Sequence, residues 1–252
     1  MKLSFFLLFW QANLKAMLKY KRILLKLSGE SLQGEDGHGI DPTVLNTYAL
    51  QIKDAVELGA EIGIVIGGGN IYRGLKGASQ GYDRVKGDYM GMLATVINAL
   101  ALQSALECIG VRSRVMTAIA MEPIGEAYSK IRMEHSLTQK EVIIFAAGTG
   151  NPFFTTDTAA ALRAIEMGAD VLLKGTRVDG IYTADPEKDS SAVKYDKLTF
   201  QEAYEKKLQI MDLTSFTMCN ENKLPIIVFN INKADNLQQV VLGGKVGTIV
   251  KP

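Results

Sequence analysis

Residues 57–69 read ELGAEIGIVIGGG, and residues 166–176 read EMGADVLLKGT. Both stretches contain a helix end, a glycine, a short apolar run and a turn with glycine. This order is typical of the point where a crossover helix returns to a buried strand of a mostly parallel sheet. Its recurrence predicts an α/β fold in which helices cover both faces of that sheet.

Neighbouring segments extend the pattern along the chain. Asp41 and Pro42 suit the N-cap and first position of a helix, and apolar residues then recur at helical spacing as far as Gly59. A long apolar helix is expected over 87–110 and a shorter one over 156–169. Strands are expected over 22–30, 61–69, 111–118, 141–148, 170–176 and 225–232. No Pro- or Ser-rich linker divides the chain, so we expect a single domain over 20–252.

Composition excludes several classes of protein. The 252 residues are 47% apolar with a formal net charge of +1, so no broad basic surface for nucleic acid is implied. Cys108 and Cys219 are far apart and neither belongs to a CxxC motif. A disulfide framework or a zinc site is therefore not expected, and a reducing cytoplasm is the expected location.

The first ten residues, MKLSFFLLFW, combine a lysine with an apolar run. The run resembles a weak signal-peptide core, but it is too short to span a bilayer as a helix. A poorly ordered tail, or a start of the protein at Met17, are the other interpretations. We expect residues 1–19 to be a poorly ordered extension, and no membrane association.

Polar loops that contain glycine follow four of the expected strands. They lie at 26–29, 67–69, 148–158 and 174–186. Ligands bind at the carboxyl ends of parallel strands, so these loops predict one site. Consecutive glycines and helix N-termini favour an anion such as phosphate. Neither GxxxxGK[ST] nor GxGxxG is present, and the glycines alone would equally suit a plain turn.

Transfer of a phosphoryl group to another phosphate fits these loops. A phosphate acceptor is already anionic and needs no general base, and the two histidines, His38 and His135, lie outside the strand-end loops. Two unit charges about 4 Å apart repel by roughly 4 kcal/mol at an effective dielectric near 20. Lys26, Arg73, Lys174, a helix N-terminus and Mg²⁺ could offset this repulsion.

Five motifs, in this order, resemble the bacterial uridylate kinase family, a branch of the amino-acid kinase superfamily. They are KLSGE (26–30), VIGGGNIYRG (65–74), GDYMGMLAT (87–95), GTGNPFFTTDTAA (148–160) and KGTRVDGIYTADP (174–186). The resemblance covers roughly residues 20–250. The third and fourth motifs together favour the uridylate branch over the carbamate, acetylglutamate and aspartate kinases.

The resemblance implies a three-layer α/β/α sandwich that transfers the γ-phosphoryl of ATP to UMP, giving ADP and UDP. Lys26 would stabilise the transferred group, Asp157 would orient Lys26, and Arg73 and Lys174 complete the expected catalytic set. The residues expected to bind ATP are Lys26, Leu27, Ser28, Gly29, Gly69, Arg73, Thr176, Tyr182 and Asp185. Those expected to bind UMP are Gly68, Asp88, Thr149, Gly150, Asn151, Pro152, Phe153, Phe154, Thr155 and Thr156.

The resemblance also implies Mg²⁺ bound with ATP, a homohexamer, inhibition by UTP and activation by GTP. The GEDGHG loop, residues Gly34, Glu35, Asp36, Gly37, His38 and Gly39, matches the activator loop. No acidic cluster predicts a protein cage for the metal, so Mg²⁺ is expected to be held largely by ATP phosphates and water.

Structural interpretations of the same residues stay open at this point. Asp88 and Asp157 could each be helix N-caps, Lys174 could simply extend from a strand end, and GEDGHG could be a hairpin without an effector. Rival functions are another small-acceptor kinase of the same fold, a nucleotide sensor or DNA-binding regulator, and a nicotinamide-dependent oxidoreductase. The presence of Lys26, Arg73 and Asp157 together disfavours a sensor without catalysis, and the near-neutral charge disfavours a DNA-binding regulator. The missing GxGxxG disfavours the oxidoreductase.

Overall fold

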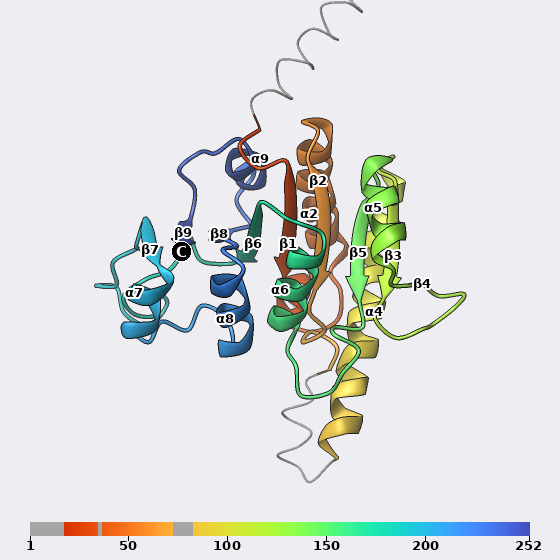
Figure 1. The fold of residues 1–252 in the computed structure, drawn as a ribbon, viewed down its shortest axis with the longest axis horizontal. Helices are drawn as coiled ribbons and strands as arrows, with labels where there is room; N and C mark the ends of the chain where they lie inside the picture. The colour runs from red at the N-terminus through yellow and green to blue at the C-terminus, as the bar shows by residue number, and fades with distance from the viewer. Residues whose placement is uncertain (1–17, 35–36, 73–82) are drawn as a thin grey trace, which may run out of the picture.

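The computed structural model describes residues 18–34, 37–72 and 83–252 (Figure 1). Its sheet has nine strands in the order β4-β3-β5-β2-β1-β6-β8-β9-β7. All neighbouring strands are parallel except β8 and β9, which are antiparallel. The strands are β1 (Arg22–Leu27), β2 (Glu61–Ile66), β3 (Ser113–Thr117), β4 (Glu126–Ala127), β5 (Val142–Ala146), β6 (Val171–Thr176), β7 (Lys197–Thr199), β8 (Ile226–Asn230) and β9 (Thr248–Lys251). The mostly parallel sheet predicted from the repeated motif is confirmed.

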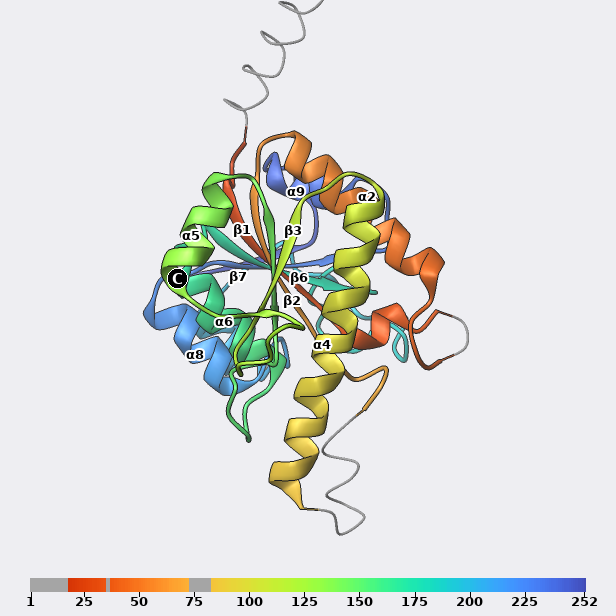
Figure 2. The ribbon, with the colours of Figure 1, turned by 90° about the vertical axis from the view of Figure 1, so that its right-hand side faces the viewer.

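Helices cover both faces of this sheet, as Figure 2 shows. They are η1 (Gly29–Leu32, a 3₁₀ turn), α2 (Pro42–Glu57), α4 (Arg84–Cys108), α5 (Lys130–Thr138), α6 (Thr156–Glu166), α7 (Phe200–Glu205), α8 (Leu213–Glu221) and α9 (Asn236–Val241). Alternate residues of β1 separate the two cores: Ile23 and Leu25 pack with α2, α4 and α9, whereas Leu24 packs with α5, α6 and α8. The fold is a three-layer α/β/α sandwich, as expected.

Local sequence signals set the start of α2. The Asp41 carboxylate accepts hydrogen bonds from the Thr43 and Val44 N–H groups, and Pro42 is the first helical residue. Beyond the helix end, Gly59 has a φ of 102°, which a side chain would disfavour. The predicted N-cap and stop of this helix are confirmed.

The start of α4 differs from the prediction. The helix begins at Arg84 rather than near residue 87, because the Asp83 side chain caps it by accepting from the Lys86 N–H at 2.9 Å. Its first turn is polar and lacks the apolar periodicity on which the prediction rested. The interpretation of Asp88 as the N-cap is therefore wrong, since Asp88 lies inside the helix.

Several elements lie outside the predictions. They are β4, α5, β7, α7, α8, α9 and β9, all short, together with the antiparallel pairing of β8 and β9. Strands of two to four residues leave too few alternating positions to produce a recognisable pattern. They lie toward the two edges of the sheet and do not alter its parallel centre.

The parallel centre brings the predicted loops to one edge. Leu27 is in register with Ile66 on β2 and with Gly175 on β6, so these three strands end side by side. The turn after β1, the glycine turn after β2 and the loop after β6 therefore meet. This convergence, expected from the sequence, positions the candidate site.

Helix α4 combines a buried face with an exposed apolar stripe, and its N-terminal half projects beyond the sheet in Figure 2. The exposed apolar residues, defined here as the α4 stripe, are Tyr89, Met90, Leu93, Ile97 and Leu100. Among the described helices, α4 is the one with the length and composition to cross a bilayer, and part of it is buried against the sheet.

Cys108, at the end of α4, and Cys219 on α8 are both free thiols.

Candidate active site

Two lysines and one aspartate form a buried charge cluster at the strand ends. Lys26 of β1 and Lys174 of β6 are register partners on adjacent strands. Asp157, in the first turn of α6, lies between them: Oδ1 is 2.7 Å from Lys26 Nζ, and Oδ2 is 2.8 Å from Lys174 Nζ. The sequence places these residues far apart, and the crossover from β5 through α6 to β6 brings them together.

Burial and the neighbouring opposite charges shift the pKa values of Asp157 and Lys174 in opposite directions. Burial by itself would raise the pKa of Asp157, but the charges of Lys26 and Lys174 outweigh it and lower that pKa. Burial lowers the pKa of Lys174, and the partial compensation by Asp157 does not reverse this. The cluster sets two ammonium groups against one carboxylate, so its excess positive charge suits an anionic ligand.

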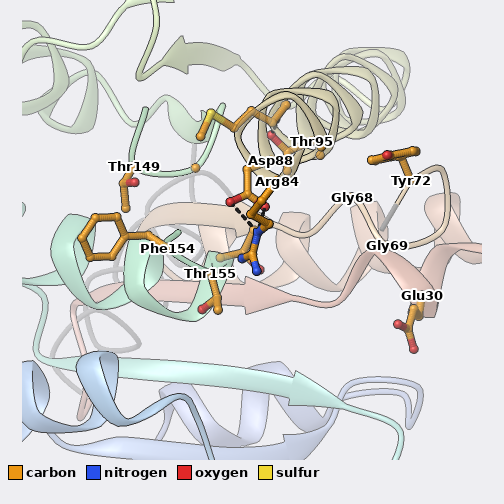
Figure 3. A pocket seen from close by; sticks show the side chains of 15 residues that line it. Glu30, Gly68, Gly69, Tyr72, Arg84, Asp88, Thr95, Thr149, Phe154 and Thr155 are labelled. Carbon is orange, nitrogen blue, oxygen red and sulfur yellow. Dashed lines mark hydrogen bonds and ion pairs between the residues drawn. The ribbon is translucent and has the colours of Figure 1, made fainter. Parts of the chain in front are cut away.

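Beside this cluster, a cavity of about 440 Å³ opens mainly between three segments, and Glu30 of η1 and Tyr72 also line it (Figure 3). Gly68 and Gly69 come from the turn after β2, Arg84 and Asp88 from the start of α4, and residues 148–149 and 154–156 from the loop before α6. A Cβ on Gly68 would lie 2.8 Å from the Ala94 Cβ and 2.9 Å from the Gly91 carbonyl, so only glycine fits against α4. We call this space the acceptor cavity.

Asp88 connects two walls of the acceptor cavity. Its carboxylate accepts from Arg84 Nε at 2.8 and 2.9 Å and from the backbone N–H of Phe153 at 2.8 Å. The Arg84 guanidinium also lies 5.7 Å from the centre of the Phe153 ring. Arg84 was not among the predicted site residues, although a spacing of four residues on a helix is typical of an ion pair such as Arg84–Asp88.

The loop from Thr149 to Thr156 forms the remaining wall and leads into α6. Its backbone turns sharply, with positive φ at Gly150 (79°) and Phe153 (71°). Thr155, rather than Asp157, caps α6, because its hydroxyl accepts from the N–H groups of Asp157 and Thr158. The residues of this loop predicted to bind UMP divide into Thr149, Phe154, Thr155 and Thr156, which line the cavity, and Gly150, Asn151, Pro152 and Phe153, which do not.

A second cavity of about 500 Å³ lies on the other side of the lysine cluster, between the loop after β6 and the segment after α7. We call it the donor cavity. Thr176, Tyr182 and Asp185 line it as a group, and Lys174 reaches it as well. The Lys174 ammonium is fixed by a further hydrogen bond to the Ile210 carbonyl at 2.6 Å. Lys174 therefore belongs both to the donor cavity and to the charge cluster.

The turn after β1 is closely packed against the glycine turn. The Leu27 side chain is fully buried, so this residue presents only its backbone. Ser28 accepts from the Ser31 hydroxyl through its carbonyl. A Cβ on Gly29 would lie 2.5 Å from the Gly67 carbonyl oxygen. Contact between these two turns therefore requires glycine at position 29.

Some predicted residues lie outside the described ones: Arg73, Glu35 and Asp36. Of the GEDGHG loop, the structure describes Gly34, Gly37, His38 and Gly39. Gly39 contacts the segment after the glycine turn, because its N–H donates to the Asn70 carbonyl and its own carbonyl accepts from Asn70 Nδ2.

Comparisons with known proteins agree with this geometry. The uridylate kinase of Parabacteroides distasonis is 63% identical over 234 residues, covering 93% of this chain and 99% of that protein. That of Porphyromonas gingivalis is 61% identical, with 93% and 98% covered. The crystal structure of UMP kinase from Bacillus anthracis superposes with a TM-score of 0.89 at 38% identity, covering 92% of this chain and 96% of that one.

The family model described as the amino acid kinase family matches residues 21–230, which include both cavities and the lysine cluster. This match extends over most of the chain, and the relatives are similar along almost their whole length. The chain belongs to the amino acid kinase family.

Proposed function

We propose that the protein is a UMP kinase that transfers the γ-phosphoryl group of ATP to UMP, giving ADP and UDP, in pyrimidine nucleotide synthesis. The observation that carries this proposal is the Lys26–Asp157–Lys174 cluster, which shares Lys174 with the donor cavity and adjoins the acceptor cavity at Thr156. Both cavities are within the size range of small-ligand sites. Relatives named uridylate kinase at 61–63% identity support UMP as the acceptor.

In the proposed reaction, UMP occupies the acceptor cavity and ATP the donor cavity. A phosphate oxygen of UMP attacks the γ-phosphorus of ATP, and a new P–O bond forms. The bond from that phosphorus to the bridging oxygen breaks, and its electron pair leaves with ADP. No proton has to move, because the attacking oxygen is already anionic at neutral pH.

The residues of this chain position the groups and stabilise their charge. Lys26 contacts the transferred group, Lys174 the phosphates of ATP, and Asp157 holds both ammonium groups at the strand ends. Asp88 accepts from the ribose hydroxyls of UMP. The space for the base is lined by Thr149, Phe154, Thr155 and Thr156. Gly68 receives the acceptor phosphate. Gly69, expected at ATP, lines the acceptor cavity as well, so we place it beside the acceptor phosphate too, and Arg73 keeps its proposed contact with ATP.

Mg²⁺ is proposed to enter with ATP, supplying further neutralisation of the phosphate charge. Within residues 18–34, 37–72 and 83–252, no three acidic, histidine or cysteine side chains converge. This arrangement fits a cation held mainly by phosphate oxygens and water, which is usual for Mg²⁺.

The acceptor is tested by a coupled assay of ADP release with MgATP and a panel of UMP, CMP, dCMP, AMP, carbamate, acetylglutamate and aspartate. Turnover with UMP well above all others is the expected result. Turnover with carbamate or an amino acid would keep the family and overturn the acceptor. UMP binding without any turnover would identify a sensor that retains the site.

We also propose a cytoplasmic homohexamer, activated by GTP through residues 34–39, inhibited by UTP, with one kinase domain over 20–252 preceded by an extension. The α4 stripe supports self-association, because five large apolar side chains at helical spacing are 36–51% exposed.

The α4 stripe gives a direct test of assembly. Replacing Leu93 and Ile97 with glutamate places charges in the proposed interface, so the oligomer should dissociate in analytical ultracentrifugation. Ile131→Glu on α5, where the side chain is 83% exposed, is the control and should leave the mass unchanged. An intact oligomer of the double variant would remove α4 from the interface.

A further inference from the structure

Two buried asparagine side chains lie beside the acceptor cavity and outside the residues assigned so far. Asn98, on α4, is fully buried, and Asn70, just after the glycine turn, is 7% exposed. Burial of an amide is unfavourable unless its donors and acceptor are satisfied. We refer to these two residues as the amide pair.

The amide pair satisfies all of its polar atoms internally. Asn98 Nδ2 donates to Asn70 Oδ1 at 2.7 Å, and Asn70 Nδ2 donates to Asn98 Oδ1 at 3.1 Å. The second donor of each amide goes to a backbone carbonyl: Asn98 to Gly67 and Asn70 to Gly39, both at 2.7 Å. Because every donor is used, each amide has one allowed orientation.

The bond to Gly67 fixes the first peptide of the glycine turn. In a trans peptide the C=O and N–H point in opposite directions, and the Gly67–Gly68 bond is not among the cis peptides. The Gly67 carbonyl faces Asn98, so the Gly68 N–H faces away from it. Within the described ranges, no acceptor is bonded to the Gly68 or Gly69 N–H, and both residues line the acceptor cavity.

The same pair also touches the neighbouring turn. A Cβ at Gly29 would lie 2.6 Å from Asn70 Oδ1 and 2.5 Å from the Gly67 oxygen. The Gly67 N–H in turn donates to the Leu27 carbonyl at 3.0 Å. Asn70 therefore packs against the turn after β1, and its orientation is set from α4 by Asn98.

We propose that Asn98 and Asn70 are positioning residues for the acceptor phosphate: they hold the Gly67–Gly68 peptide so that the Gly68 N–H is directed at that phosphate. This inference rests on the proposed function, because it assigns the occupant of the acceptor cavity. Neither asparagine touches the reacting atoms; both act through the backbone of the turn.

The test is steady-state kinetics of Asn98→Leu, which keeps the branched shape and removes both N–H donors together with the acceptor for Asn70. A free Gly67 carbonyl lets the peptide rotate, so the KM for UMP should rise about tenfold or more, while the KM for ATP changes less than about threefold. Asn98→Asp and Asn70→Ala should show the same split, and they keep the test available if the leucine variant fails to fold.

Gln51→Leu provides the matched control for stability. Gln51 is buried on α2, and its amide donates to the Ile231 carbonyl at 2.6 Å, away from the glycine turn. Its removal should lower the Tm as Asn98→Leu does and leave the KM for UMP unchanged. A role of the amide pair in stability alone would give the two variants the same kinetics.

Folded Asn98 variants with a KM for UMP within threefold of wild type would overturn the inference, as would an equal rise in both KM values. The wild type is assayed in parallel, so a wild type without UMP turnover would overturn the proposed function instead. Calorimetric titration with UMP would then decide the role of the amide pair by the same tenfold criterion.

Discussion

Asp157 and Asp88 stand near the starts of two helices beside the same cavity, and their side chains are about equally exposed, at 15% and 12%. Their partners differ. Asp157 is held by two lysine ammonium groups from adjacent strands. Asp88 is held by one arginine from its own helix and by a backbone N–H of the loop opposite.

The difference separates two tasks that a carboxylate can perform. A carboxylate between two buried cations sets their positions and charge, so its loss should act mainly on the chemical step. A carboxylate that joins a helix to a loop can exchange its partners for hydroxyl groups of a ligand, so its loss should act on binding.

Lys26→Ala should slow the chemical step that the cluster around Asp157 supports. It removes a charge that contacts the transferred group, and a loss of about 3 kcal/mol of transition-state stabilisation is expected, roughly a hundredfold or more in kcat/KM. Steady-state kinetics measures it, and Lys53→Ala on α2 serves as a control for loss of a lysine. A loss below tenfold would contradict the role of Lys26.

Asp88→Ala should weaken the binding of UMP. The KM for UMP should rise about tenfold, because a charged hydrogen-bond partner is lost, while the KM for ATP should stay nearly constant. Arg84→Ala is a comparison variant: it removes the helical ion pair and keeps the Asp88 carboxylate in the cavity wall, so its effect on the KM for UMP should be smaller than that of Asp88→Ala. Unchanged UMP affinity of Asp88→Ala in calorimetry would leave Asp88 a structural role only.

Asp157→Asn should reveal, through the pH dependence of folding stability, the charge coupling that distinguishes Asp157 from Asp88. The pKa of Asp157 is lowered from 3.8, so its contribution to folding stability is fully present above that value and is lost as pH falls through the lowered pKa. In urea unfolding at several pH values, the deficit of Asp157→Asn relative to wild type should shrink below pH 3.8. Asp54→Asn, at an exposed position on α2, is the control. A deficit independent of pH would contradict the charge coupling.

The central fold was predictable because its signals are local. β1, β2, β5 and β6 are apolar runs that end in glycine-bearing turns, and Asp41–Pro42 specifies a helix start within two residues. The start of α4 was misplaced because Asp83 and Arg84 precede the apolar periodicity. The edge strand β7 and its neighbour β9 were missed because they are too short to show any periodicity.

The candidate site was only partly predictable. Position at strand ends identified Lys26, Gly68 and Lys174 as candidates, because parallel strands share their carboxyl edge. Asp157 and Lys26 are far apart in the sequence, so no local pattern encodes their contact. The prediction of this contact came from the resemblance to a family. Arg84 and the amide pair were missed, because their significance depends on which face of α4 meets the glycine turn.

The register of Lys26 and Lys174 has a consequence for how this chemistry is acquired or transplanted. Adjacent strands lie about 4.8 Å apart, so two lysines in register on one face repel each other unless a carboxylate separates them. Loss of the aspartate would leave the two ammonium groups facing each other without a counter-charge. A designer who moves this site to another parallel sheet must therefore move three residues together: one lysine on each of two neighbouring strands, and an aspartate in the first turn of the helix that leads into one of those strands.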